Sequence, residues 1–407
     1  MKFSIIIPVY NRPDEVDELL ASLTKQTRRN FDVHIIEDGS SIPCKAVCAR
    51  YGLVDGGFPA VASPSAPAVA SPAASAPPSP SSPAPAPSSS FPLYYYVKEN
   101  GGPGAARNYG ADRATGDYLI VLDSDVVLPP DYIAAIEQEL EDQPADAFGG
   151  PDRAHPDFSP LQKAISYAMT SFFTTGGIRG GNSSKGRRQT RALDKFYPRS
   201  FNMGVSRELW QQLGGFRRMR FGEDIDFSYR ICEAGARCRL FPEAWVWHKR
   251  RTDFRKFFRQ VRNSGVARIN LQLLHPGTMK LVHTLPAVFT VGCALLMIPI
   301  IIGLAMVVIG LIGAYVGNDS GCNMSLVLSI FGGMMMAVSM LPLLLYALLI
   351  LIDSSFRNHS LRVGLLSIPA SFIQLTGYGS GFLSAFWKRM VLRQKDEGFD
   401  TNEKLYK

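Results

Sequence analysis

Short apolar runs alternate with stretches of helical spacing in the N-terminal third of the chain. The runs FSIIIPV, FDVHIIED, LYYYVKEN and YLIVL predict strands, and VDELLASLTKQ, IPCKAVCARYG and GPGAARNYGADRA between them predict helices. A strand, a helix and a further strand in this order are typical of crossover units, which build a parallel sheet. Ligands of such sheets gather at the carboxyl ends of the strands, where this chain has Asn11, Asp38, Asn100 and Asp123.

From Leu281 onward the pattern changes to long apolar blocks. Residues 285–317 and 324–352 each exceed the ~20 residues that span a bilayer, and neither contains a charged side chain. The third block, 363–386, contains serines, a glutamine and several glycines and is followed by the basic stretch WKRMVLRQK. Charge bias therefore favours two full crossings with an interfacial or re-entrant third segment, or a first block divided at Pro299. The number of membrane crossings, between two and four, remains open.

These patterns predict the organisation of the chain. We expect an N-terminal α/β domain over residues 1–265, an interfacial connector over 253–280, membrane helices over 281–390 and a polar tail over 391–407. Residues 56–91 are almost entirely alanine, proline and serine, which predicts a flexible insertion without a catalytic part. The start MKFSIIIPVY lacks the long apolar run of a secretory signal. The N-terminal domain is therefore expected on the cytoplasmic side of the inner membrane.

The distribution of charge and cysteine supports this organisation. The net charge of +8 is concentrated in a few stretches, above all HKRRTDFRKFFRQVR, directly before the first apolar block. There Phe254, Phe257 and Phe258 alternate with arginines and a lysine at helical spacing, which predicts an amphipathic helix at an anionic membrane surface. Nucleic acid is not an expected partner, because the aromatic residues are not interleaved with the basic residues in the way that a stacking platform needs. The six cysteines show no zinc-binding spacing.

Acidic residues at two places are candidates for chemistry. Asp123 and Asp125 flank Ser124 in an extended segment, so their side chains point the same way, about 6 to 7 Å apart. They could hold one divalent ion, or one ion and a ribose hydroxyl, or simply end a strand. Glu223 and Asp224 begin a predicted helix, where acidic residues are also favoured by the helix dipole.

Several separate motifs in one order resemble the family 2 glycosyltransferases, which have the GT-A fold. They are SIIIPVYNRPDE, FDVHIIEDGS, GGPGAARNYGADRATGDYLIVLDSDVVLPPDY and FNMGVSRELWQQLGGFRRMRFGEDIDF, and together they cover residues 1 to about 265 apart from the insertion. The resemblance implies a Rossmann-like, mostly parallel sheet, and an enzyme that moves a sugar from a nucleotide donor. It also implies a divalent metal cofactor, Mn²⁺ or Mg²⁺.

The resemblance assigns roles to the matched positions. For the nucleotide sugar it implies Pro8, Tyr10 and Arg12 near the base, Asp38 reading the base, Arg107 near the diphosphate and Asp123 near the ribose. For the metal it implies Asp125, and in some relatives a histidine equivalent to His248, which could equally be a packed edge residue. For catalysis it implies Asp224 as the general base beside Glu223, with Asp226 as an alternative base or a helix-capping residue. Asn202 could bind acceptor or donor sugar, or support a turn.

The expected activity follows from these roles together with the anchor. We expect an inverting transfer from a uridine diphosphate sugar, with guanosine and thymidine diphosphate sugars as alternative donors. The expected acceptor is lipid-linked or a saccharide, and the expected pathway is the assembly of the cell envelope or surface polysaccharide. The QxxRW motif of processive polysaccharide synthases is absent, since Gln260 is followed by VRNSG, which favours single-sugar transfer. Two alternatives remain, a polyprenyl-phosphate sugar synthase and a non-catalytic membrane scaffold.

Overall fold

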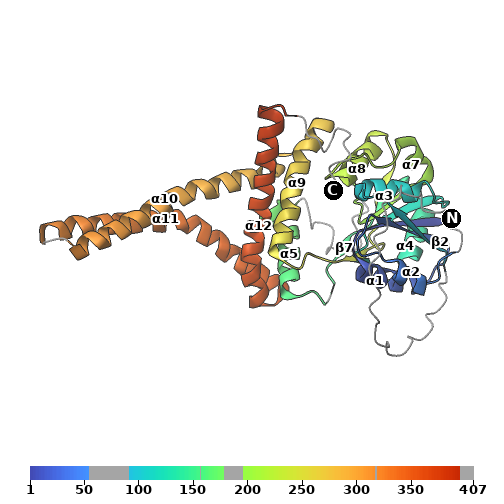
Figure 1. Ribbon diagram of the computed structural model, residues 1–407, viewed down its shortest axis with the longest axis horizontal. Coiled ribbons are helices and arrows are strands. Elements are labelled where there is room, and N and C mark those ends of the chain that lie inside the picture. The colour runs from blue at the N-terminus through green and yellow to red at the C-terminus, as the bar shows by residue number, and fades with distance from the viewer. Residues whose placement is uncertain (55–90, 156, 178–195, 317–318, 395–407) are drawn as a thin grey trace, which may run out of the picture. The chain divides into compact units, whose positions relative to one another are not determined.

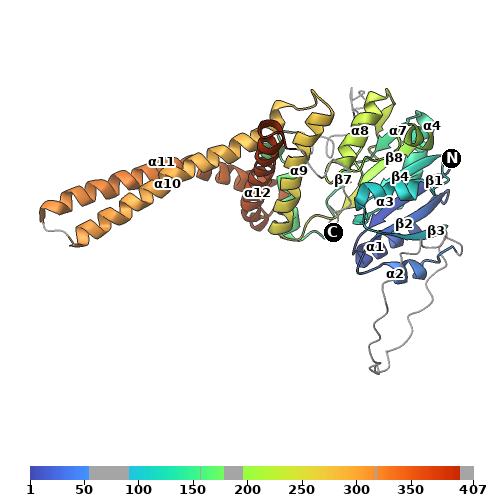
Figure 2. The same ribbon diagram turned by 45° about the horizontal axis from the view of Figure 1, so that its top comes forward.

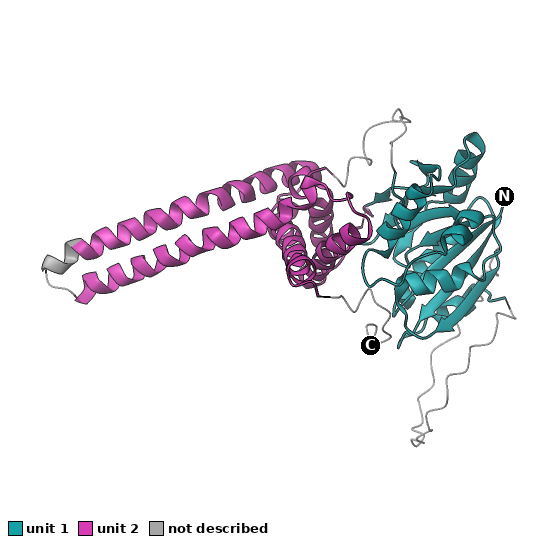
Figure 3. Ribbon diagram, turned by 90° about the horizontal axis from the view of Figure 1, so that it is seen from above, with its two compact units in different colours: residues 1–153, 186–249, 397–407 teal, residues 154–185, 250–396 magenta. Residues whose placement is uncertain are grey.

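The computed structural model describes residues 1–54, 91–155, 157–177, 196–316 and 319–394, so nearly all of the predicted insertion lies outside the described residues. The chain divides into two compact units (Figure 3). Unit 1 contains residues 1–153, 186–249 and 397–407, and unit 2 contains residues 154–185 and 250–396. The chain therefore passes from unit 1 to unit 2 and back before it enters the C-terminal helices.

Unit 1 is built on a seven-stranded sheet with the order β3-β2-β1-β4-β8-β6-β9. The strands are β1 (Phe3–Val9), β2 (Phe31–Asp38), β3 (Leu93–Lys98), β4 (Tyr118–Leu122), β6 (Ala147–Gly149), β8 (Asn202–Ser206) and β9 (Cys238–Leu240). The first four are mutually parallel, and β8 runs antiparallel to its neighbours β4 and β6. The prediction of a mostly parallel α/β sheet followed by helices is confirmed.

Helices cover both faces of this sheet (Figures 1 and 2). One face packs against α1 (Pro13–Thr24), α2 (Lys45–Arg50) and α4 (Tyr132–Asp142), and the other against α3 (Gly102–Ala111), α7 (Arg207–Leu213) and α8 (Glu223–Glu233). Alternate residues of one strand point to opposite faces. Ile5 and Ile7 accordingly join the first core, and Ile6 joins the second. Burial on both faces explains why these strands are continuous apolar runs.

A small second sheet lies beside the carboxyl end of β4. It has the order β5-β10-β7, with β5 (Val126–Val127), β10 (Val246–His248) and β7 (Asp152–Arg153). In the antiparallel pair of β5 and β10, His248 is directly opposite Val126. This register brings a residue from the end of unit 1 beside the two aspartates that follow β4.

Unit 2 is helical. Its elements are α5 (Pro160–Thr170), α6 (Phe172–Thr175), α9 (Phe254–Leu274), the 3₁₀ turn η1 (Leu281–His283), α10 (Leu285–Val316), α11 (Asp319–Asn358), α12 (Leu361–Phe386) and the π-helical turn η2 (Trp387–Val391). Side chains of α5, α9 and α12 form one apolar core, which includes Ala168, Phe257 and Ala370. Helices α9 and α12 approach closely, because a Cβ on Gly381 would lie 2.0 Å from the carbonyl oxygen of Arg262.

Helices α10 and α11 form a long pair that extends away from the other helices of unit 2 (Figure 3). The segments Leu281–Val316 and Met324–Asn358 are long and apolar enough to cross a membrane, and 11% of an apolar 18-residue stretch in each is buried. At ~1.5 Å per residue, α10 is about 48 Å long, against a hydrocarbon core of ~30 Å. Among the described residues, α12 does not pass the same test, in keeping with its packing against α5 and α9.

Candidate active site

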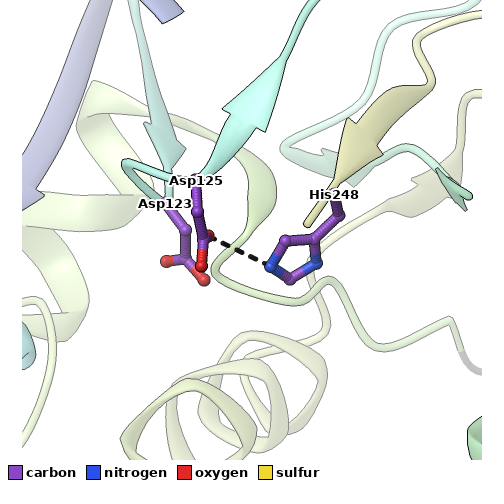
Figure 4. Close-up of side chains that lie close together, drawn as sticks. All are labelled: Asp123, Asp125 and His248. Carbon is purple, nitrogen blue, oxygen red and sulfur yellow. Dashed lines mark ion pairs between the residues drawn. The ribbon is translucent and has the colours of Figure 1, made fainter. Parts of the chain in front are cut away.

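Three side chains that could hold a metal ion meet at the carboxyl end of β4 (Figure 4). Asp123, Asp125 and His248 each offer a ligand atom, and these atoms all lie within 4.8 Å of one another. Asp123 directly follows β4, Asp125 directly precedes β5, and His248 ends β10. Two carboxylates and an imidazole supply the oxygen and nitrogen donors that suit Mn²⁺, and carboxylates suit Mg²⁺. The donor set therefore fits the divalent cation that the sequence predicts.

The surroundings of His248 orient its ring toward Asp125. Its Nε2 lies 3.2 Å from Oδ1 of Asp125, and its ring stacks on Phe201 with centroids 5.1 Å apart. Its buried Nδ1 has no hydrogen-bond partner within the part of the chain that the structure describes. The other oxygen of Asp125, Oδ2, accepts a hydrogen bond of 2.7 Å from Nη1 of Arg12. The Arg12 guanidinium thus places a positive charge beside the carboxylates of the site.

Arg107 connects Asp123 to the GED motif. Its side chain is buried and donates to Asp123 and Glu223 over 3.0 Å each and to Ser200 over 3.1 Å. Burial disfavours its charged form, but the carboxylates of Asp123, Glu223 and Asp224 outweigh that cost and raise the pKa of Arg107. The side chain of Asp123 is 30% exposed, so it remains accessible to a ligand while it pairs with Arg107.

Glu223 and Asp224 have different partners although they are adjacent. They open helix α8, which begins after Gly222 in a left-handed conformation with φ of 84°. Burial, together with the charge of Asp224, raises the pKa of Glu223 despite its pairing with Arg107. Asp224 is also desolvated, but Arg199, which donates to its Oδ2 over 2.8 Å, and Arg107 lower its pKa. Asp224 is therefore held as a carboxylate.

Asp226 is fully buried, and both of its oxygens pair with arginines. Nη1 of Arg217 lies 3.0 Å from Oδ1, and Nε of Arg230 lies 2.9 Å from Oδ2. This arrangement is that of a structural ion pair within α8 and the preceding loop. It gives Asp226 no path to a substrate.

Other residues predicted for nucleotide binding lie at the ends of β1 and β2. Tyr10 is exposed, and Pro8 is half-buried. The buried carboxylate of Asp38 accepts hydrogen bonds from the backbone amides of Gly101 and Gly102, at 2.9 and 2.8 Å, and pairs with Lys98. Asp38 therefore fixes the start of α3, the helix that carries Arg107.

Asn202 is buried, and both ends of its side-chain amide bond within unit 1. Its Oδ1 accepts from the hydroxyl of Tyr132 at 2.6 Å, and its Nδ2 donates to the carbonyl of Ala244 at 2.7 Å. These are the contacts expected of a supporting residue. They tie β8 to the segment that leads into β10 and hence to His248.

Arg199, Ser200 and Phe201, just before β8, are the site residues that the sequence did not indicate. Each contacts a predicted site residue, namely Asp224, Arg107 and His248 respectively. Arg199 and Ser200 directly precede the FNMG motif and Phe201 is its first residue, which was the only available signal. An arginine or a phenylalanine at such a place is equally typical of an ordinary surface turn.

The sequence is similar to those of known glycosyltransferases. The family model described as "Glycosyl transferase family 2" matches residues 4–57 and 85–214. Glycosyltransferase GlyA of Streptococcus pneumoniae serotype 4 is 24% identical over 149 residues, which are 37% of this chain and 16% of that protein. An uncharacterized glycosyltransferase of Haemophilus influenzae is 31% identical over 142 residues, 35% of each chain. This chain thus spans well under half the length of these relatives.

Among solved structures, S. aureus TarS 1–349 in complex with UDP-GlcNAc matches with a TM-score of 0.43 and 16% identity, over 66% of this chain and 67% of that chain. The mannosyltransferase PcManGT from Pyrobaculum calidifontis, in complex with GDP-Man and Mn²⁺, matches with a TM-score of 0.48 and 13% identity, over 95% of this chain and 88% of that chain.

Proposed function

Because this chain is a family 2 glycosyltransferase of the GT-A fold class, we propose that it transfers one sugar from a nucleotide diphosphate sugar to a lipid-linked acceptor, with inversion at the anomeric carbon. The observation that carries the proposal is the joining of two carboxylate groups by one buried guanidinium. Through Arg107, the candidate metal site at Asp123 is connected to Glu223 and so to the candidate base Asp224. The proposed donor site and the proposed base thus lie at one edge of the sheet.

The donor side of the site is built to receive a diphosphate. Asp125 and His248 would hold a divalent cation, which supplies positive charge to the diphosphate leaving group when it is bound. Asp123, with one oxygen on Arg107, keeps an accessible oxygen for a ribose hydroxyl. Arg12 pairs with Asp125, so its guanidinium would lie near a bound nucleotide. A uridine diphosphate sugar is the proposed donor, and the neighbours described above bind UDP-GlcNAc or GDP-Man.

The acceptor side is centred on Asp224. In a single displacement, the acceptor oxygen bonds to the anomeric carbon as the bond from that carbon to the diphosphate oxygen breaks. The hydroxyl proton passes to the Asp224 carboxylate, so no glycosyl-enzyme intermediate forms. Asp224 has a lowered pKa and is ionised at neutral pH, as a general base must be before the reaction. Arg199 leaves its Oδ1 free of that ion pair.

Unit 2 supports an acceptor that resides in the membrane. Its two long apolar helices could cross a bilayer, and the arginines of α9 lie just before them in the chain. The positive-inside rule then favours a cytoplasmic N-terminal domain. A lipid-linked acceptor at the inner leaflet, used in the assembly of the cell envelope or surface polysaccharide, fits this placement.

A donor and acceptor screen tests the proposal. Nucleotide sugars are incubated with the full chain and Mn²⁺ or Mg²⁺, first alone and then with a polyprenyl phosphate or a polyprenyl diphosphate-linked sugar. We expect metal-dependent release of the nucleoside diphosphate, and transfer to the diphosphate-linked sugar that Asp224→Asn abolishes. Transfer to the polyprenyl phosphate, insensitive to Asp224→Asn, would contradict the assigned acceptor and base. Full activity in excess EDTA would contradict the metal.

A further inference from the structure

Two aromatic side chains of unit 2 are exposed at the tip of the α5–α6 segment. Phe172 is 65% exposed and Phe173 is 38% exposed. Their rings lie edge to face with centroids 5.9 Å apart. The segment lies within the region that the family model matches, and the sequence-based division of the chain includes it in the N-terminal domain. In the structure it belongs to unit 2.

The polar groups of this tip are turned inward, which is the reverse of an ordinary surface turn. Thr174 is buried, and its hydroxyl donates to the carbonyl of Ala168 at 2.6 Å. The hydroxyl of Thr175 donates to the carbonyl of Ser171 at 2.8 Å, and the amide of Gly176 donates to the carbonyl of Phe172 at 2.9 Å. No residue between Lys163 and Arg179 is charged. The tip can therefore leave water without exposing unsatisfied polar groups to lipid.

The tip lies beside the start of α10 and the last third of α11. The hydroxyl of Tyr346, on α11, donates to the carbonyl of Phe173 at 3.3 Å. On the other side, a Cβ on Gly176 would lie 2.3 Å from a methyl carbon of Val282, three residues before α10 starts. Lys280 is the last charged residue before α10, and the apolar side chain of Val288 on α10 is 64% exposed. Helix α6 therefore lies at the level where the polar flank changes to apolar surface.

From this juxtaposition we propose that Phe172 and Phe173 insert into the boundary between headgroups and acyl chains of the lipid leaflet from which α10 and α11 depart. Aromatic side chains favour this boundary, since they combine an apolar body with tolerance of a partly wet environment. The segment is then a membrane contact separate from the spanning helices and from the basic helix α9. It anchors the chain just before the return to unit 1, where the catalytic residues lie.

The inference rests on the proposed membrane placement of α10 and α11 but not on catalysis. It is tested with the full chain carrying Phe172→Trp in a Trp387→Phe background, which removes the tryptophan that belongs to unit 2. The protein is reconstituted in vesicles of phosphatidylethanolamine and phosphatidylglycerol. We expect the emission of the added tryptophan to shift to shorter wavelength, and to be quenched by lipids brominated in the upper part of the acyl chain but not by aqueous iodide.

A matched control is Val97→Trp in the same background, because Val97 lies on β3 of unit 1 and is 49% exposed. Its added emission should be quenched by iodide and not by brominated lipid. Phe173→Trp serves as the second probe if Phe172→Trp does not fold. Quenching of the added tryptophan by iodide, or shielding from both quenchers by a second copy of the chain, would overturn the proposal. Donor hydrolysis measured on the same vesicles distinguishes this failure from failure of the proposed catalytic function.

Discussion

The Nε of Arg199 lies 2.8 Å from Oδ2 of Asp224, while the neighbouring Glu223 pairs with Arg107. Two adjacent carboxylates thus have separate cations. Without them, two buried like charges would raise one another's pKa and one would be protonated. The pairing lowers the pKa of Asp224 and leaves that of Glu223 raised. Arg199 is accordingly proposed to act as a positioning residue for the base.

Replacing Arg199 by Gln should move the acidic limb of the pH–rate profile to higher pH. Asp224 must be ionised to accept a proton. Loss of the Arg199 charge raises the pKa of Asp224, so Asp224 becomes protonated at a higher pH. The loss of kcat at neutral pH should be smaller than the about 10² to 10⁴ that removal of a general base costs. The measurement is kcat against pH for the parent, Arg199→Gln and Asp224→Asn.

Arg199→Lys is the matched control, because it keeps the charge while changing its geometry. It should keep the acidic limb near that of the parent. An identical acidic limb in Arg199→Gln and the parent would show that Arg199 does not set the ionisation of the base.

Loss of either proposed metal ligand should weaken the dependence on Mn²⁺. In Asp125→Asn and His248→Gln the donor set loses a charge or a nitrogen ligand. We expect the Mn²⁺ concentration for half-maximal donor hydrolysis to rise, and kcat at saturating Mn²⁺ to fall by about 10² or more for Asp125→Asn, since transition-state charge stabilisation by a metal is worth several kcal/mol. An unchanged Mn²⁺ titration in both variants would exclude this site.

Arg107→Met should destabilise unit 1 strongly. It leaves Asp123 and Glu223 without their shared cation, and breaking a buried ion pair on one side costs about 3 to 5 kcal/mol. The loss of stability is measured by thermal unfolding of the full chain and by the hydrogen-exchange protection of β4 and α8. The control is Arg237→Met, since Arg237 is 64% exposed in its pair with Asp146 and exposed pairs of this kind contribute little to stability. Equal effects of the two substitutions would contradict the bridging role of Arg107.

Gly150→Ala should disturb the metal site without touching a ligand. A Cβ there would lie 1.7 Å from the carbonyl oxygen of Ala244 and 2.6 Å from Nδ2 of Asn202. The segment before β10 must then shift, and His248 shifts with it. Disturbing a residue that supports a ligand costs about 10- to 100-fold in metal affinity. Mn²⁺ titration of donor hydrolysis measures the loss, with Gly292→Ala as control, since nothing lies within 4 Å of a Cβ there.

The parts of unit 1 that depend on local pattern could be predicted from the sequence. Strands β1, β2 and β4 are buried on both faces and therefore appear as uninterrupted apolar runs. The resemblance of motifs placed Asp123, Asp125 and Asp224 together in one proposed site. In the structure Arg107 joins Asp123 to Glu223, the neighbour of Asp224, and Asp125 lies beside His248. The assigned role of each residue is still a proposal.

Contacts set by tertiary pairing could not be predicted. The antiparallel insertion of β8 between β4 and β6 depends on packing, and it is β8 that brings Arg199 and Phe201 to the site. The hydrogen bonds of Asp38 to Gly101 and Gly102 join residues more than sixty positions apart. No local spacing in the sequence indicates such a partner.

The course of the chain through both units has a practical consequence for protein engineering. A soluble enzyme would normally be sought by stopping the chain after Lys249, before the apolar helices. Helix α5 would then remain, but it would lose the residues of α9 and α12 that cover Ala164, Ile165 and Ala168. A shortened protein of this kind would expose a new apolar helix and should aggregate. Excising residues 154–185 as well, and closing the gap with a short polar linker, is the more promising route.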